Sequence, residues 1–462
     1  MENVTRSRMN VAEPRVAIVG AGPAGIYAAD ILLGLLPAAT VDLFEKLPAP
    51  YGLVRYGVAP DHPRIRKITD ALHEVLTSPR IRLLCNVEIG VDVGISELRA
   101  AYDGVIVATG ADLDVPLDIP GIDLPGSFGA AEFVAWYDGH PDVPRSWPLT
   151  AESVAVLGAG NVALDVTRIL AKHAAALSRT DTPDTVLEQL AASPMRDVHL
   201  FARRGPADVR FSALELRELA DQHDVDVIVD PDELVLDAHA ERMIEQFSQR
   251  RIIVRTLTEW ADRTPSTPIA SRRIHLHLRQ RPVQLFGTDA VTGIEMERTA
   301  SDQLGRMVGT GEMLRYDVGA VYRAIGYRST PVPGIPFDAE RGVVPHVEGR
   351  VTDGDGTRIP RLYATGWIKR GPIGLIGSTK SDAAQTVRHL VDDLEDAAER
   401  PAEQAADPVA ALTAAVDFAG WLRIDDAERR AGAERGRERA KLVDRDEMLG
   451  HALPVPIGEV VR

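Results

Sequence analysis

The chain has a single cysteine, Cys85, among its 462 residues. Disulfides, CxxC redox pairs, iron–sulfur clusters and thiolate zinc sites all need more than one cysteine. None of them can therefore form within this chain. This excludes enzymes that work through a thiol pair or an iron–sulfur cluster of their own.

Long apolar runs and excess positive charge are also missing. The longest apolar runs fall short of the roughly 18 residues that a membrane span needs, and the opening MENVTRSRMN lacks the apolar region of a secretory signal. We therefore expect a cytoplasmic protein. The net charge of −16 argues against general nucleic-acid binding. The 12 histidines show no metal-ligand spacing, so no metal site is predicted.

A glycine-rich motif stands out near the start of the chain. Residues 16–19 are continuously apolar, which is typical of a strand buried on both faces of a parallel sheet. Gly20, Gly22 and Gly25 follow at GxGxxG spacing and lead into a helical stretch. Such glycines permit a tight turn, a close approach to a pyrophosphate and close packing of helix on strand.

An acidic residue completes this motif. A second apolar stretch, residues 41–44, ends in Glu45, where a carboxylate is placed to accept hydrogen bonds from a ribose 2′-OH. Gly-rich turns occur in other α/β proteins, but strand, glycines, helix, strand and acid together predict a dinucleotide site. Residues 47–67 are too irregular for a regular element, and a loop this long inside a compact domain is typically functional.

The pattern repeats about 138 residues further along the chain. Residues 153–157 predict a strand, and Gly158, Gly160 and Ala163 give GxGxxA before a helix through Leu170. The first unit closes near Ala111, so the chain is predicted to carry two dinucleotide folds in tandem.

A pair of arginines suggests which nucleotide the second unit binds. The predicted strand 198–202 ends in Arg203 and Arg204. A site for NAD would carry an acidic residue here, whereas paired arginines suit a ribose 2′-phosphate. Two solvated surface arginines are the alternative. We predict that the second nucleotide is NADPH.

The rest of the chain gives weaker signals. The expected elements are an amphipathic helix at 211–222 carrying Glu215 and Glu218, mixed strands and turns at 223–324, a helix from about Ser378, and surface helices without recognisable chemistry from Pro401 onward.

Five blocks, spread in one order over nearly the whole chain, resemble the adrenodoxin-reductase type of ferredoxin–NADP⁺ reductase, including its actinobacterial members. They are GAGPAG at 20–25, YGLVRYGVAPDHP at 51–63, GAGNVALDVTRIL at 158–170, RRG at 203–205 with LELREL at 214–219, and ATGWIKRGPIGLIGSTK at 364–380. The glycine motifs alone are shared by many flavoproteins, so the specificity lies in the combination.

The resemblance implies an α/β fold with two Rossmann-like dinucleotide-binding domains, the NADPH domain being inserted into a split FAD domain. The implied FAD domain comprises residues 14–111 and 327–462, the latter with a helical C-terminal extension. The implied NADPH domain comprises residues 112–326.

The resemblance also implies which residues bind the cofactors. For FAD they are Gly20, Gly22, Pro23, Ala24, Gly25, Glu45, Leu53, Trp367, Gly374 and Ile376, with Gly374 leaving room for nicotinamide. For the NADPH pyrophosphate they are Gly158, Gly160, Asn161 and Val162, and for its adenosine end Arg203, Arg204 and Glu215.

His62 and Glu218 are implied to lie near the hydride-transfer site as candidate catalytic residues that handle protons. The alternative for His62 is a loop residue that only positions backbone. For Asp165, in the NVALD run, the alternative to a role in the site is a buried helix residue that is tied to a neighbouring loop. Arg251 and Arg255 are candidates for partner docking if their segment is helical, although the IIV between them also suits a strand.

The implied reaction is hydride transfer from NADPH to FAD, followed by single-electron transfer to a ferredoxin, an acidic iron–sulfur protein that often feeds a cytochrome P450. A flavin is needed because nicotinamide gives two electrons at once and a ferredoxin accepts one. The family precedent favours a monomer. A flavin monooxygenase and a non-catalytic nucleotide-binding flavoprotein sensor stay open as alternatives.

Overall fold

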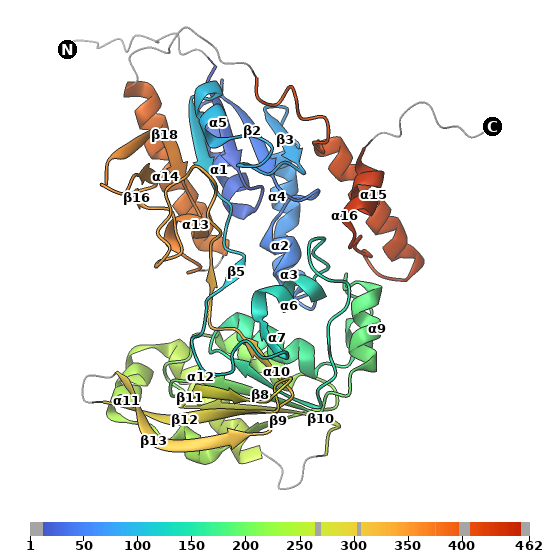
Figure 1. Cartoon of the computed structure of the whole chain (residues 1–462), viewed down its shortest axis with the longest axis vertical. Helices are drawn as coiled ribbons and strands as arrows, with labels where there is room; N and C mark the ends of the chain where they lie inside the picture. Colours follow the sequence, from blue (N-terminus) through green and yellow to red (C-terminus); the bar gives the residue numbers. More distant parts are fainter. Residues whose placement is uncertain (1–12, 264–268, 303–305, 375, 397–406, 454–462) are drawn as a thin grey trace.

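Two sheets built mainly of parallel strands lie one above the other in Figure 1 and organise the chain. The computed structural model describes residues 13–263, 269–302, 306–374, 376–396 and 407–453. In both sheets, helices connect the parallel strands. The prediction of an α/β fold with two Rossmann-like units, the second inserted into the first, is confirmed. None of the helices in these ranges is long and apolar enough to cross a membrane.

The first sheet combines strands from both ends of the chain. In spatial order they are β16 (His346–Val347), β17 (Arg350–Thr352), β18 (Arg358–Ala364), β4 (Gly104–Val107), β1 (Arg15–Val19), β2 (Thr40–Glu45) and β3 (Ile81–Cys85). From β18 to β3 the strands are parallel.

Both faces of this first sheet are covered. Along β1, Val16 and Ile18 face one apolar cluster while Ala17 and Val19 face another, as alternation in a strand requires. The continuous apolar run of the sequence follows from this two-sided burial. The helices of this unit are α1 (Pro23–Leu35), α2 (Leu53–Tyr56), α3 (Pro63–Arg66), α4 (Ile68–Leu76), α5 (Ile95–Ala101), α13 (Trp367–Arg370) and α14 (Ile376–Asp396).

The second sheet is parallel throughout. Its strands, in spatial order, are β6 (Ser127–Gly129), β14 (Ala320–Arg323), β7 (Ser153–Leu157), β8 (Asp197–Ala202), β10 (Arg272–Leu278) and β9 (Val225–Val229). Its helices are α6 (Ala130–Tyr137), α7 (Asn161–Ala171), α8 (Ala174–Leu177), α9 (Asp184–Ala192), α10 (Ala213–Ala220), the 3₁₀ helix η1 (Pro231–Leu234), α11 (Ala238–Gln246) and α12 (Ser248–Arg263).

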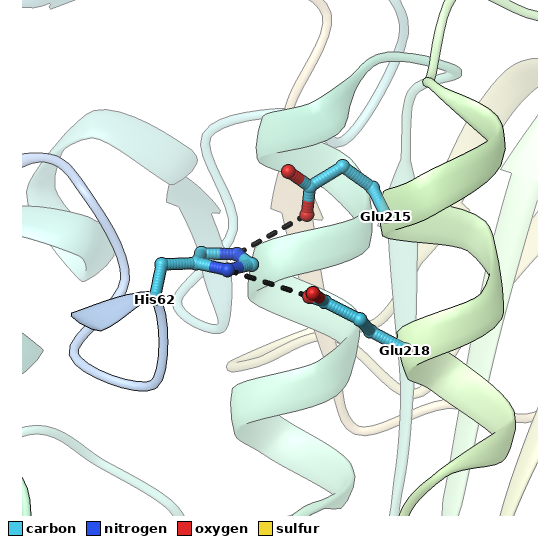
Figure 2. A group of neighbouring side chains, drawn as sticks. All are labelled: His62, Glu215 and Glu218. Carbon is cyan, nitrogen blue, oxygen red and sulfur yellow. Dashed lines mark ion pairs between the residues drawn. The ribbon is translucent and has the colours of Figure 1, made fainter. Parts of the chain in front are cut away.

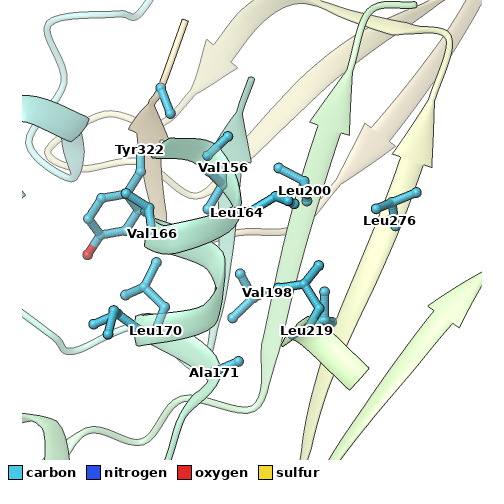
Figure 3. Packing of buried hydrophobic residues seen from close by; sticks show 14 of the residues in the cluster. Val156, Leu164, Val166, Leu170, Ala171, Val198, Leu200, Leu219, Leu276 and Tyr322 are labelled. Atoms are coloured by element: carbon cyan, nitrogen blue, oxygen red, sulfur yellow. The ribbon is translucent and has the colours of Figure 1, made fainter. Parts of the chain in front are cut away.

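One face of the second sheet packs against α7 and its neighbours. Leu164 of α7 lies among Val156, Val198 and Leu200 of the strands, and all four side chains are almost fully buried (Figure 3). The opposite face is covered by the antiparallel strands β11 (Gln280–Phe286), β12 (Gly293–Ser301) and β13 (Met307–Tyr316). This packing holds the ends of β7 and β8 in place, where the second glycine motif lies.

Two antiparallel segments, β5 (Leu113–Asp114) and β15 (Tyr327–Arg328), connect the two units, and Figure 1 shows β5 between them. The C-terminal helices α15 (Phe418–Glu434) and α16 (Arg445–Ala452) pack beside the first unit.

The expectation of mixed strands and turns at residues 223–324 is confirmed for the strands but missed two α-helices. Helices α11 and α12 lie between β9 and β10. In α12 the buried residues Ile253, Leu257 and Trp260 recur every three or four positions, which is a helical period that the polar residues between them obscured.

Helices are present after Pro401, as expected, but the expectation that they lie only at the surface is wrong for the described part of that region. Trp421 and Ile424 of α15 and Met448 of α16 are almost fully buried in the core of the first unit. The expectation that residues 47–67 hold no regular element also needs correction, because the single-turn helices α2 and α3 lie there.

Candidate active site

The first glycine turn joins β1 to α1. Gly20 has a φ of +107°, and a Cβ there would lie 2.5 Å from the carbonyl oxygen of Ala108. A Cβ on Gly25 would lie 1.9 Å from the carbonyl oxygen of Gly20. Both positions therefore require glycine, and the helix starts directly against the strand. The first N–H groups of α1, at Ala24 and Gly25, have no partners within the helix, so this end can bind an anion.

Glu45 lies beside this turn, at the end of β2. Its Oε2 accepts the N–H of Ala21 at 2.9 Å, and its Oε1 accepts the N–H of Leu47 at 3.1 Å. Burial raises the pKa of the Glu45 carboxyl, against the lowering effect of these two N–H donors. The carboxylate is thus held at the turn, where a ribose hydroxyl of a bound dinucleotide would need it.

The second glycine turn joins β7 to α7. A Cβ on Gly158 would lie 2.3 Å from the carbonyl oxygen of Ala324, so glycine is required there as well. A Cβ on Gly160 would meet nothing within 4 Å, so this side of the turn is open in front of the helix. Asn161 Oδ1 accepts the N–H of Ser212 at 2.9 Å and so ties the turn to the start of α10.

Arg203 and Arg204 follow β8, the parallel neighbour of β7, and therefore lie on the same edge of the sheet as the second turn. Their carbonyl oxygens accept hydrogen bonds from Thr299 and Arg279, which fixes the backbone. Arg203 is exposed and Arg204 half-buried. Two cationic side chains thus project from a fixed backbone beside the glycine turn.

His62 of the first unit lies in contact with side chains of the second unit. It lies on the loop between α2 and α3, and its ring points at two glutamates of α10 (Figure 2). Nε2 lies 3.1 Å from Glu215 Oε2, and Nδ1 lies 3.3 Å from Glu218 Oε2. Asp165 of α7 adds a third carboxylate, with its Oδ1 3.0 Å from Nε2. The His62 side chain is only 6% exposed.

The carboxylates around His62 change its acidity. Burial opposes a positive charge on the ring, but the hydrogen bonds with Asp165 and Glu215 outweigh it and raise the pKa of His62 to about 10. Arg168 acts in the opposite direction by charge repulsion. Burial also raises the pKa of Glu218, against the attraction of His62 and Arg168. The cluster can therefore hold a proton within reach of several acceptors.

Sequence reasoning missed three charged members of this cluster, Asp61, Arg168 and Lys172. Nε and Nη2 of Arg168 each donate to Asp61 at 2.8 Å, and Lys172 Nζ lies 2.5 Å from the same carboxylate. Burial alone would raise the pKa of the Asp61 carboxyl, but these two cations outweigh burial and lower that pKa. Arg168 follows Asp165 by three positions on one face of α7, and Lys172 comes directly after the end of this helix, which was the available signal.

Four further predicted site residues lie in the first unit. Trp367 begins α13, with its ring centroid 6.4 Å from that of Tyr327. Gly374 is exposed and has a φ of +90°. Leu53 begins α2, directly after Gly52, whose Cα lies 3.9 Å from the place of a Cβ on Gly22. Ile376 begins α14, but its side chain lies outside the described residues.

Other positions in the predicted sets follow the two turns. Pro23 and Ala24 open α1, and Val162 is the second residue of α7. Glu215 was predicted at the adenosine end of NADPH, and its carboxylate faces His62 in this structure. The adenosine contact stays a prediction.

The donor set fits two dinucleotides. Each turn offers a helix N-terminus for a pyrophosphate, with the acid Glu45 beside one and the arginine pair Arg203 and Arg204 beside the other. His62, Glu215 and Glu218 also have ligand atoms within 4.8 Å of one another, close enough for a metal ion. These side chains already form ion pairs among themselves, so nothing here calls for a metal.

The chain is similar to known proteins in sequence and in fold. The sequence profile of the family described as "Pyridine nucleotide-disulphide oxidoreductase" matches residues 14–372. NADPH-ferredoxin reductase FprA of Mycobacterium tuberculosis is 41% identical over 456 residues, covering 94% of this chain and 98% of that protein. Mitochondrial NADPH:adrenodoxin oxidoreductase of Arabidopsis thaliana is 37% identical over 458 residues, covering 95% of each chain. The solved structure of Mycobacterium tuberculosis FprA in complex with NADPH has a TM-score of 0.89 at 40% identity and covers 96% of this chain and 100% of that chain.

Proposed function

This chain belongs to the pyridine nucleotide-disulphide oxidoreductase family, and we propose that it is a FAD-dependent NADPH–ferredoxin reductase of the adrenodoxin-reductase type. It takes a hydride from NADPH and passes the electrons singly to a ferredoxin-type iron–sulfur protein. The observation that carries the proposal is the pairing of two dinucleotide turns, one in each unit, with a histidine–carboxylate cluster where the units meet.

The single cysteine separates this chain from the thiol–disulfide enzymes of its family. Reduction of a disulfide substrate through a protein dithiol needs two cysteines that exchange electrons. Cys85 is the only one, and it is fully buried. The flavin must therefore transfer its electrons to an acceptor outside this chain.

FAD would be bound at the first glycine turn and NADPH at the second. When bound, FAD accepts two electrons as a hydride and can release them one at a time. The N-terminus of α1 would bind its pyrophosphate and Glu45 its ribose. Trp367 and the exposed Gly374 would border the flavin ring, where a side chain at position 374 would narrow the space for nicotinamide.

Selectivity for NADPH is proposed to come from Arg203 and Arg204. A ribose 2′-phosphate carries a charge that NADH lacks, and two guanidinium groups at the end of β8 can pair with it. Asn161, held by the N–H of Ser212, would fix the backbone that cradles the pyrophosphate.

His62 is proposed to move a proton. Transfer of two electrons from NADPH to two ferredoxins yields NADP⁺ and releases one proton, so the site needs a route for it. The ring nitrogens of His62 face Asp165 and Glu215 on one side and Glu218 on the other. Glu218 is the most exposed of these carboxylates, with a third of its side chain accessible, so it would pass the proton to solvent.

The domain division is proposed to follow the two sheets. Residues 14–111 and 327–462 would form the FAD domain and residues 112–326 the NADPH domain. The proposal is supported by strand membership, because the first sheet takes its strands from residues 15–107 and 346–364 and the second from residues 127–323.

Docking of the ferredoxin is proposed to involve α12. Arg251 and Arg255 are exposed and one turn apart on this helix, so an acidic partner could contact both. We further propose that the enzyme acts as a cytoplasmic monomer and that a cytochrome P450 is among the acceptors beyond the ferredoxin. Size-exclusion chromatography and a reconstituted hydroxylation assay would test the last two points.

Anaerobic flavin reduction tests the proposed function. The protein, purified with added FAD, is mixed with NADPH or NADH while its visible spectrum is recorded. Bleaching of the flavin bands by NADPH, much faster than by NADH, is the expected result. Bound flavin that neither nucleotide reduces would overturn the assignment as a reductase, and failure to bind FAD at all would overturn the cofactor assignment.

A further inference from the structure

We propose that Arg168 is a positioning residue, which holds the His62 ring in place and keeps its Nε2 able to act as a proton acceptor. The proposal rests on the proposed function, because it concerns the proton route of that reaction. It deepens the function by naming a residue that neither binds a cofactor nor carries the proton.

Arg168 lies at the centre of the charged cluster. Its side chain extends from α7 in the second unit to the loop of the first unit and is only 1% exposed. Its Nε and Nη2 bind the two oxygens of Asp61 at 2.8 Å each, a bidentate pair that fixes the plane of the guanidinium. From this fixed plane, Nη2 also reaches Asp165 Oδ1 at 2.8 Å and His62 Nε2 at 2.6 Å. Two consecutive loop residues, Asp61 and His62, are thus held by one side chain.

The contact between Arg168 and His62 has a chemical consequence. A guanidinium is always charged and has only N–H donors, so a contact of 2.6 Å with Nε2 is attractive only when that nitrogen has a free lone pair. A proton on Nε2 suits Asp165 and Glu215 instead, because their oxygens lie 3.0 Å and 3.1 Å away and can only accept. Arg168 and the carboxylates therefore compete over the protonation of one nitrogen.

The two protonation states differ in the contact between Arg168 and the ring. In the neutral state Nε2 accepts from Arg168 while Nδ1–H points at Glu218. In the charged state Nε2–H points at the carboxylates, and Arg168 gives up its contact with Nε2 while it keeps those with Asp61 and Asp165. The proton can leave and return without a movement of the loop, which is what a proton relay needs.

The charges around the ring explain why an arginine is needed. The charged groups around His62 are Asp61 of its own loop, Asp165 and Arg168 of α7, Lys172 directly after α7, and Glu215 and Glu218 of α10. Two further phenols near Asp165, of Tyr137 and Tyr327, stay neutral because burial raises their pKa values. Four carboxylates thus oppose two cations. Without Arg168 only Lys172 would remain, and the carboxylates would hold the proton on His62 much more tightly.

The test compares Arg168→Gln with Lys172→Met in the FAD-loaded protein. Gln keeps an amide N–H donor near the position of the arginine Nε but removes the charge and the group that contacts His62, whereas Lys172 pairs with Asp61. The ring titration of His62 is followed by NMR of labelled histidine, with His62→Gln assigning the signal. Arg168→Gln is expected to raise the titration midpoint by at least one pH unit, and Lys172→Met by less than a third of that. Equal shifts in the two variants, or no shift in Arg168→Gln, would overturn the proposal.

A second variant keeps the test decisive if Arg168→Gln does not fold. Arg168→Lys retains the buried charge, but a single ammonium cannot make the bidentate contact with Asp61 and also reach His62. We expect ferredoxin-dependent turnover with NADPH, in which the reduced flavin must release its proton, to lose about tenfold in kcat with an unchanged KM. An unchanged kcat per folded enzyme would overturn the positioning role. Because the ring titration needs no NADPH, it stands independently of whether the wild-type protein reduces flavin at all.

Discussion

Arg55 and Glu428 form an ion pair that is almost completely buried, although 373 positions separate them in the sequence. Arg55 belongs to α2, beside the first glycine turn, and Glu428 to the C-terminal helix α15. Arg439 and the N–H of Leu442 also bind the Glu428 carboxylate. The C-terminal segment is thus anchored to the loop region of the predicted flavin site.

Removal of this carboxylate is expected to destabilise the protein. Glu428→Gln keeps the shape but leaves the buried guanidinium of Arg55 without its counter-charge, which should cost about 3–5 kcal/mol in the free energy of unfolding. Urea denaturation measures the difference. Asp426→Asn is the matched control, because Asp426 on the same helix pairs with Arg430 at the surface and should cost at most about 1 kcal/mol. Equal costs for the two variants would contradict the anchoring role.

Lys441 gives a prediction about pH. Its ammonium is 1% exposed and lies near Asp138 and Asp181 of the second unit, and it donates to the carbonyl oxygens of Arg55 and Asp138. Burial and the repulsion of Arg66 lower its pKa to about 8, against the attraction of the two aspartates. The unfolded chain holds this proton up to about pH 10.4.

Between these two values the unfolded state binds more protons than the folded state, so this lysine makes stability rise with pH. In Lys441→Met that contribution disappears, and lost hydrogen bonds should lower stability by about 1–3 kcal/mol at pH 7. The gap between wild type and variant should therefore widen from pH 8 to pH 10. Urea midpoints across this range measure it, and a gap that stays constant would contradict the buried titration.

Gly25→Ala should impair FAD binding. The added Cβ would lie 1.9 Å from the carbonyl oxygen of Gly20, so α1 must move away from β1. We expect a purified protein with little flavin and lower thermal stability. Gly34→Ala in the same helix is the control, since its Cβ would meet nothing within 4 Å and alanine should add about 0.5–1 kcal/mol of helix stability. Equal flavin content in the two variants would refute the steric argument.

The double variant Arg203→Ala, Arg204→Ala should lose its preference for NADPH. Loss of two charge-assisted contacts with a 2′-phosphate is worth about 3–6 kcal/mol at most, so a fall of two or more orders of magnitude in kcat/KM for NADPH is expected, with little change for NADH. Arg196→Ala is the control, because Arg196 precedes the same strand and is exposed at its opposite end. An equal loss with both nucleotides would point to a structural role.

The fold was predictable where local pattern and buried surface agree. The apolar runs of β1 and β7, each followed by glycines, mark strands whose turns admit no other residue type. In contrast, α12 escaped prediction because polar residues dilute its helical period. The position of α15 could not be predicted from the sequence either, because it depends on contacts between distant parts of the chain, such as the ion pair of Arg55 with Glu428.

The candidate site was open to prediction only in part. The glycines, Glu45 and the arginine pair were predicted from spacing, and His62 with Glu218 from the resemblance. Arg168 and Asp61 were missed, because their pairing depends on how the two units meet. Periodicity along α7 could have suggested a charged face, but only the structure shows the loop that it contacts.

Ferredoxin-dependent turnover tests the central claim most directly. The FAD-loaded protein is incubated with NADPH and cytochrome c, with and without a purified ferredoxin, and the reduction of cytochrome c is followed. The account predicts slow reduction without ferredoxin and a rate that rises and saturates with ferredoxin concentration, while NADH supports much less. Flavin that NADPH reduces but that transfers its electrons no faster when ferredoxin is present would contradict the assignment.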